Sequence, residues 1–236
     1  MYHKLKYGNN GKDMTTPRTS AESAAAQRAQ TFLDWTRINA KALTAGAVVV
    51  LVAAAAYWFY LRSREIQVVN AEKALLTAKQ SMSAGNAALA QSDLQKVYAR
   101  YGSTPAGVEA AMLLAQLDYD SGKFQDGIST LQKISRTAAA ARVEPTIENL
   151  EGDGYAQMGK LAEAAKRYEG AAAAASGLET EQAFYRAKAA RTYQSAGDTA
   201  KARQLWTSIE NDPKSQSMAA EGRVRLGELT VSVAKK

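Results

Sequence analysis

The pattern of small, large and polar positions repeats four times between residues 66 and 213. Four glycines lie 37 or 38 residues apart: Gly85, Gly122, Gly159 and Gly197. Small residues stand seven before and five after each glycine, and mostly larger apolar ones stand nine and twelve after it. In chain order these four columns read Ala78, Ala115, Gly152, Ala190; Ala90, Gly127, Ala164, Ala202; Leu94, Leu131, Tyr168, Trp206; and Val97, Ile134, Ala171, Ile209. A fixed period of this kind predicts a solenoid of stacked repeats.

Each unit is expected to be a pair of antiparallel helices. A glycine between two helical stretches can adopt the left-handed conformation that ends one helix and turns into the next. Small residues on both sides of the turn allow the two helices to approach closely. The predicted pairs are 66–84/86–101, 105–121/124–140, 144–158/161–176 and 180–196/199–210. The predicted fold class is therefore all-α, with an α-solenoid of about four helix pairs.

A last helix over 214–233 is expected to cap the array. Such arrays need a terminal element that covers the final apolar face. The apolar residues available for this contact are Met218, Val224, Leu226, Leu229 and Val231.

The units resemble the tetratricopeptide repeat over residues 66–213. The third unit carries the family's pattern most clearly, with Gly152, Tyr155, Gly159, Ala164, Tyr168 and Ala171 at the family's spacing. The first unit departs most, because Ser81 stands where the family prefers tyrosine. The period also exceeds the family's 34 residues by about three, so slightly longer turns or second helices are expected.

The resemblance implies a concave groove lined by the first helix of each unit. The family's groove columns fall here on Glu109, Met112, Gln116, Tyr119, Asp120, Asn149, Asp153, Gln157, Phe184, Arg191 and Gln194. This mixed lining suits a bound peptide or helix, so Tyr119→Ala is expected to weaken partner binding and to spare stability. The alternative is that these side chains are solvated or covered by the last helix. The clamp for terminal carboxylates that some members carry is not expected, since Arg191 is the one strong cation in these columns.

A charge-free segment precedes the repeats. No charged residue occurs between Lys41 and Arg62, and twenty helical residues span about 30 Å, the thickness of a bilayer core. The sequence therefore predicts a transmembrane helix over 42–61. The residues expected at the membrane interface are Trp35, Tyr57, Trp58, Tyr60 and Arg62, since aromatic and basic side chains settle there.

Two other interpretations of this segment remain. It could be a buried core helix, or the small residues Ala53 to Ala56 could mark a signal-peptidase site. The long preceding tail is unlike a secretory n-region, and the apolar stretch is long enough to span. An uncleaved signal anchor is favoured.

Residues 1–41 form a basic tail that carries +4 of the chain's net charge of +7. A basic tail before the first span favours a cytoplasmic amino terminus, with the repeat domain 62–236 in the periplasm of a bacterial inner-membrane protein. Helix formers dominate from Ser20 onward, and Phe32, Trp35 and Ile38 recur at three-residue spacing. They predict a membrane-proximal helix that either lies on the membrane surface or simply extends the span.

Several classes of chemistry are not expected. The chain has no cysteine and a single histidine, His3, and no phosphate-binding loop, metal-ligand spacing or nucleophile turn occurs. The basic residues form no stripe that could follow nucleic-acid phosphates. Tyrosines at helical spacing, such as Tyr155 and Tyr168, are more typical of packing than of catalysis. We therefore expect no enzyme, no cofactor, no metal and no nucleic-acid partner.

Three classes of function compete. A basic tail, one span and a periplasmic solenoid resemble the ancillary subunit of the SecYEG translocon, whose members are thought to link the channel to periplasmic chaperones. The alternative is a structural accessory subunit of another large membrane assembly, such as a respiratory or photosynthetic complex. The third class, an enzyme built on the solenoid, lacks a catalytic constellation. The sequence favours a membrane-anchored scaffold for protein–protein interaction.

Overall fold

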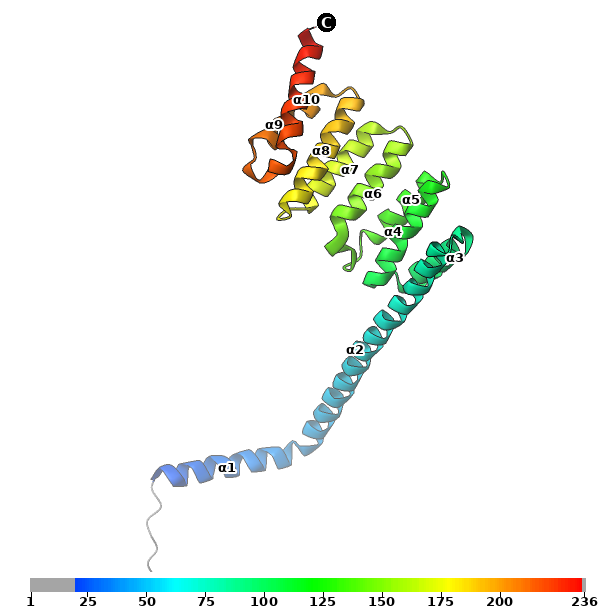
Figure 1. Ribbon diagram of the computed structural model, residues 1–236. Coiled ribbons are helices and arrows are strands. Elements are labelled where there is room, and N and C mark those ends of the chain that lie inside the picture. Colours follow the sequence, from blue (N-terminus) through cyan, green and yellow to red (C-terminus); the bar gives the residue numbers. More distant parts are fainter. Residues whose placement is uncertain (1–19, 235–236) are drawn as a thin grey trace, which may run out of the picture. The chain divides into compact units, whose positions relative to one another are not determined.

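Helices and short connections make up residues 20–234, the part of the chain that the computed structural model describes (Figure 1). Its elements are α1 (Ser20–Ile38), α2 (Ala40–Ser83), α3 (Ala87–Tyr101), α4 (Pro105–Asp120), α5 (Phe124–Ile134), η1 (Ala140–Val143), α6 (Glu144–Gln157), α7 (Leu161–Ala174), α8 (Glu179–Ser195), α9 (Thr199–Asn211), η2 (Pro213–Ser215) and α10 (Gln216–Ala234). The all-α prediction is confirmed. The chain divides into two compact parts between Leu61 and Arg62.

The first of these two parts, up to Leu61, contains α1 and the beginning of α2. The helix expected from Ser20 onward is present as α1, and the rings of Phe32 and Trp35 stack with their centroids 6.3 Å apart. Residues 1–19 of the predicted basic tail lie outside the described residues. Among the described residues, α2 is the helix whose length and apolar composition would allow it to cross a membrane.

Helix α2 joins the predicted span and the first predicted repeat helix in one element. No glycine or proline occurs between Gly46 and Gly85, so nothing in this stretch interrupts the backbone hydrogen bonds. Arg62, which follows the charge-free segment, pairs with Glu65 one turn later at 2.7 Å. The predicted interface residues Trp35, Tyr57, Trp58 and Tyr60 are exposed.

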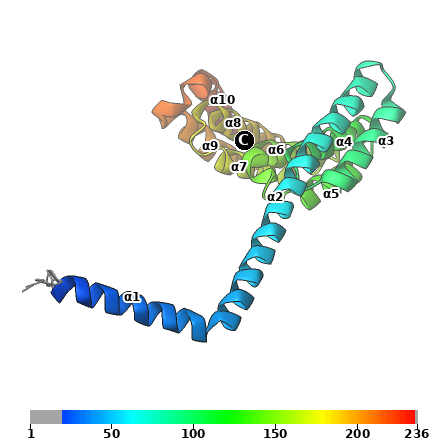
Figure 2. The ribbon, with the colours of Figure 1, turned by 90° about the horizontal axis from the view of Figure 1, so that it is seen from below.

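The second part of the chain, from Arg62 onward, is the repeat array. Within it, α4 to α9 lie side by side in chain order in both ribbon views (Figures 1 and 2). The four periodic glycines have φ between 73° and 83°, as the turn argument requires. Gly177, in the turn between α7 and α8, has a φ of 89° and was not singled out by the repeat pattern.

The periodic columns form the core. All the small and large residues of the four columns are buried. A Cβ atom on Gly152 would overlap the ring of Tyr168 from the facing helix, which explains why a small residue stands there. The prolines also act as expected, since Pro105 and Pro145 stand in the first turn of their helices.

One boundary prediction needs correction. The second helix of the second pair ends at Ile134 instead of residue 140. The hydroxyl of Thr137 donates to the carbonyl of Ile134 at 2.8 Å and accepts from the N–H of Ala140 at 3.3 Å. These local bonds replace helical ones, and the chain continues into η1.

The predicted capping helix is confirmed as α10, but one of its predicted contacts is wrong. Leu229 is buried against Trp206 and Ile209, and Met218 and Leu226 pack beside them. Val224 was expected in this contact but is exposed, because it stands on the opposite side of the helix from these residues. The side chain of Val231 lies outside the described residues.

Candidate partner-binding groove

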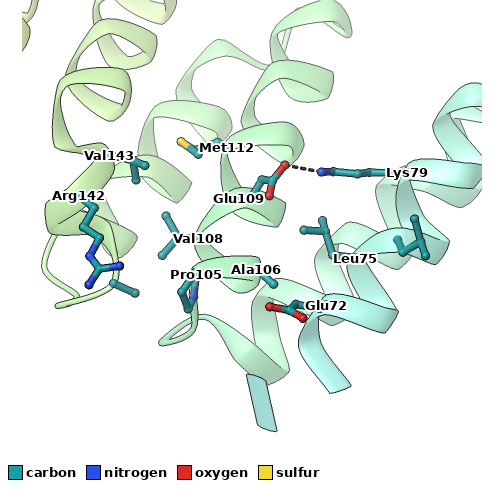
Figure 3. Close-up of a pocket in the computed structure, with 12 residues that line it drawn as sticks. Glu72, Leu75, Lys79, Pro105, Ala106, Val108, Glu109, Met112, Arg142 and Val143 are labelled. Carbon is teal, nitrogen blue, oxygen red and sulfur yellow. Dashed lines mark hydrogen bonds and ion pairs between the residues drawn. The ribbon is translucent and has the colours of Figure 1, made fainter. Parts of the chain in front are cut away.

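A groove of about 510 Å³ lies between the C-terminal half of α2, the first half of α4 and η1 (Figure 3). Its apolar lining is Leu75, Leu76, Pro105, Ala106, Val108, Met112, Ala139 and Val143. Its charged lining is Glu72, Lys79, Glu109 and Arg142. A concave apolar surface with a few polar groups is the usual form of a binding site.

Local sequence sets the position of α4 in this groove. The hydroxyl of Thr104 accepts a hydrogen bond from the N–H of Gly107 at 3.1 Å and so caps the helix, while Pro105 occupies its first turn. Gly107 also lies against the backbone of Tyr101, where a Cβ atom would not fit. The start of α4 is therefore held tightly against the end of α3.

The charges of the groove are only partly neutralised. Lys79 on α2 forms an ion pair with Glu109 on α4, and Figure 3 shows this pair crossing the space between the two helices. Glu72 and Arg142 form no ion pair with any other residue in the described part of the chain. Figure 3 shows these two side chains on opposite sides of the groove. A ligand here would meet apolar side chains flanked by one acidic and one basic group.

Two of the residues predicted from the family's columns, Glu109 and Met112, line this groove. Gln116 and Asp120 on α4 and Gln157 on α6 are exposed but do not line this groove. Tyr119 is buried on α4, and the remaining predicted residues belong to the third and fourth units. The eleven predicted residues therefore do not form one site.

Asn149 and Asp153 of α6 are held by a polar network with α8. The ammonium of Lys188 donates to Asn149 Oδ1 at 2.7 Å and to Asp153 Oδ1 at 2.5 Å. It also lies 4.4 Å from the centre of the Tyr168 ring, whose hydroxyl donates to Asp153 at 2.8 Å. These groups already satisfy one another, so a partner would gain less from them than from unpaired charges.

The fourth-unit residues differ in their accessibility. The guanidinium of Arg191 donates to both carboxylate oxygens of Glu221 on α10, at 2.8 and 3.1 Å. The alternative that the last helix covers predicted groove residues thus applies to Arg191. Phe184 is exposed and meets Tyr185 edge to face with centroids 5.6 Å apart, and Gln194 is half-buried.

The prediction for Tyr119 is wrong. Its side chain is only 6% exposed, and its hydroxyl donates to the carbonyl of Leu150 at 3.1 Å. Its ring occupies space left by Gly127 and Gly154, where added Cβ atoms would overlap it. Burial, with the nearby carboxylate of Glu151, raises the pKa of Tyr119 above its ordinary range. Among the predicted groove residues of α4, Tyr119 stands at the edge of the row, on the side of the helix that faces the third helix pair.

Sequence reasoning missed several charged residues on these surfaces. Lys188 stands one turn before Arg191 on α8, a helical spacing that could have placed it on the same face. Lys79 could have been found from its place one turn after Leu75 on the first repeat helix. Arg142 lies in η1, outside any helical periodicity, so the sequence carried no signal for it.

A buried carboxyl group lies outside the groove, between α6 and α7. Glu151 is 1% exposed, and Arg167 stands 3.2 Å from both Glu151 and Glu148. Burial raises the pKa of Glu151 to about 7, although Arg167 opposes this effect. Within residues 20–234, no three histidine or carboxylate side chains come together as metal ligands.

Several solved structures and a family model are similar to the chain. No curated protein matches the chain. Solved structures similar to it include a Podosopora anserina chain of nearly identical TPR-like repeats, at 15% identity and a TM-score of 0.49, covering 69% of this chain and 91% of that one. MamA is similar at 18% identity and a TM-score of 0.46, covering 67% and 97%.

The family assignment rests on the sequence match to the tetratricopeptide repeat-like domain, which extends over residues 34–147 and 71–189. Together these two matches cover more than half of the chain. Repeats of this kind form scaffolds for protein–protein interaction. The chain belongs to the tetratricopeptide repeat-like domain family.

Proposed function

We propose that this protein is a non-enzymatic scaffold anchored in the bacterial inner membrane, whose groove between α2, α4 and η1 binds a segment of another polypeptide. The observation that carries the proposal is the groove itself. It combines apolar walls with the unpaired charges of Glu72 and Arg142, which suits an amphipathic peptide or helix. Residues 42–61 support the anchor, because they are charge-free and exposed along a helix long enough to span a bilayer.

The role that we propose within this class is an ancillary adaptor of the translocon type. The amino terminus would be cytoplasmic and the repeats periplasmic, where they would link the channel to periplasmic chaperones or client proteins. The net charge of +4 on residues 1–41 as a whole supports this orientation.

One feature favours the second candidate, a structural subunit of another large membrane assembly. Helix α1 exposes Phe32, Leu33, Trp35 and Ile38, an apolar surface that lipid or a neighbouring subunit would cover. A structural subunit should stay bound at fixed stoichiometry through detergent purification, whereas an adaptor should dissociate.

Membrane anchorage can be tested by fractionation. The full chain should remain in the membrane pellet after alkaline extraction. The double variant Val50→Arg/Leu51→Arg should move to the soluble fraction, because each arginine at the centre of a span costs about 3 kcal/mol. Val50→Ala/Leu51→Ala is the matched control and should stay in the pellet. Recovery of the unaltered chain in the soluble fraction would refute the anchor.

Groove binding can be tested by site-specific photo-crosslinking in intact membranes. A benzophenone side chain at Met112 should attach to a polypeptide partner, and Arg142→Glu should reduce the yield several-fold. The same side chain at Lys133, exposed on α5 away from the groove, is the control. Equal yields at both positions would show that the groove is not the binding surface.

A further inference from the structure

Helix α2 carries a second apolar face within the repeat domain. On one side, Ala71, Leu75 and Ala78 are buried in the core of the first helix pair of the repeat domain. About half a turn away, Ile66, Val69 and Leu76 are 48%, 45% and 58% exposed. A helix that is apolar on two opposite faces is normally covered on both, and in the described part of the chain only the first of these faces is covered.

The exposed residues follow the spacing of a helix-packing seam. Arg62, Ile66, Val69, Lys73, Leu76 and Gln80 alternate at intervals of four and three residues, and we call this set the outer seam of α2. That interval keeps side chains on one side of a helix and is the repeat by which two helices pack along each other. The apolar positions of the outer seam would therefore face a second helix.

The surface around the outer seam is shaped to receive side chains. A depression of about 200 Å³ is lined by Ile66 and Val69 together with Arg62, Glu65 and Asn70. Further along, Leu76 also lines the groove described above. The outer seam thus has a hollow near its start and is continuous with the groove near its end.

The unpaired charge within the outer seam indicates which kind of helix would fit there. Lys73 stands between Val69 and Leu76, is exposed, and pairs with no carboxylate in the part of the chain that the structure describes. Arg62 is already neutralised by Glu65 at 2.7 Å. A carboxylate on the facing helix would remove the unpaired charge at the centre of the contact.

We propose that an α-helix of a membrane-protein partner packs along the outer seam of α2, with apolar side chains on Ile66, Val69 and Leu76 and a carboxylate on Lys73. A second copy of this chain fits less well. If the chain is membrane-anchored as proposed above, two copies must run parallel, and in register this would place Lys73 against Lys73. Like charges at a helix–helix contact disfavour that pairing.

The test is site-specific crosslinking of the full chain in native membranes. A benzophenone side chain replaces Val69 in one variant and Gln67, exposed off the seam, in the matched control. Val69 should give at least tenfold more adduct than Gln67. The attachment point, mapped by mass spectrometry, should lie on a helix within one turn of an aspartate or glutamate. Capture of a protein without such an attachment point counts against the inference.

Charge exchange then tests the contact itself. Lys73→Glu should lower the adduct yield at Val69 about tenfold, and replacing the mapped partner carboxylate by lysine should restore it. Because Lys73 is exposed, the variant should unfold at the same temperature as the wild type. An adduct between two copies of this chain, an adduct with lipid alone, no adduct, or an unchanged yield in Lys73→Glu would each overturn the inference.

The outcome can be separated from that of the proposed function. Retention in the membrane pellet and an adduct at Met112 test anchorage and groove binding without using the outer seam. If both are positive and Val69 gives no adduct, the proposed function stands and the outer-seam inference fails. If the chain is soluble after alkaline extraction, the proposed function fails whatever Val69 shows.

Discussion

Single side chains decide how closely neighbouring repeats can approach, and Tyr119 is the clearest case. It lies on α4, yet its ring occupies space left by Gly127 on α5 and Gly154 on α6. Its hydroxyl bonds the carbonyl of Leu150, also on α6. One tyrosine therefore ties the second unit to the third, and its contribution to stability should be large.

Tyr119→Ala should destabilise the repeat domain by about 3–5 kcal/mol, the usual cost of removing a buried aromatic side chain. Tyr119→Phe keeps the ring and loses one hydrogen bond, which should cost only about 1 kcal/mol. Urea denaturation followed by circular dichroism measures both. An Ala variant as stable as the wild type would restore the groove role that the sequence predicted.

Glu151 makes stability depend on pH. Its pKa rises from 4.5 in the exposed state to about 7 in the folded protein, because burial penalises the carboxylate. The folded protein therefore holds this proton more tightly than the unfolded chain. The stability gained in this way is fully present below pH 4.5 and is lost as the pH rises through 7.

The wild type should lose up to about 3 kcal/mol between pH 4.5 and 7 through this one group. Glu151→Gln should remove that part of the slope, whereas Glu163→Gln, at an exposed position on α7, should leave it unchanged. Denaturation midpoints measured across this pH range test the difference. Identical slopes for Glu151→Gln and the wild type would show that Glu151 is not the group responsible.

The crossing of α6 and α7 shows why helices in this array pair as they do. Gly152 lets the ring of Tyr168 lie directly on the backbone of α6. The Tyr168 hydroxyl then reaches Asp153 at 2.8 Å. A small residue on one helix and a large one on the other thus fix the crossing.

Gly152→Leu should separate α6 from α7, because a large side chain would enter a closed space. Such overpacking costs about 1–3 kcal/mol or more. Gly227→Ala is the matched control, since nothing lies within 4 Å of a Cβ atom there. It should stabilise the protein by about 0.5–1 kcal/mol through helix propensity. Thermal unfolding that places Gly152→Leu level with the wild type would contradict the repeat register.

The helix pairs were predictable because their determinants are local and periodic. Gly85 and its three equivalents set the turns through φ, and the small columns set the crossings, both of which the sequence displays. The early end of α5 was not predictable, because it depends on the side-chain bonds of Thr137. The groove was predicted only in part. Arg142 lies outside the periodic helices, and the burial of Tyr119 depends on glycines of other helices.

The repeat domain is held together mainly by contacts between neighbouring helices. In such an array stability is close to a sum of terms from adjacent units, so the last unit depends on what covers it. Here α10 covers Trp206 and Ile209 with Leu229. Glu221 adds a bidentate pair with Arg191 at 2.8 and 3.1 Å, and the carbonyl of Leu229 accepts from Arg203 at 3.2 Å.

Leu229→Ala should therefore loosen the fourth unit before the others. The side chain is 3% exposed, and emptying such a site costs about 2–5 kcal/mol. Val224→Ala, on the same helix but 61% exposed, is the matched control and should change stability by less than about 0.5 kcal/mol. Hydrogen exchange should speed up in α8, α9 and α10 of the Leu229 variant, while α4 to α6 stay protected, because the lost contact lies beside the last pair. Uniformly faster exchange across all the repeats would mean that the domain unfolds as one unit and that α10 does not act as a local cap.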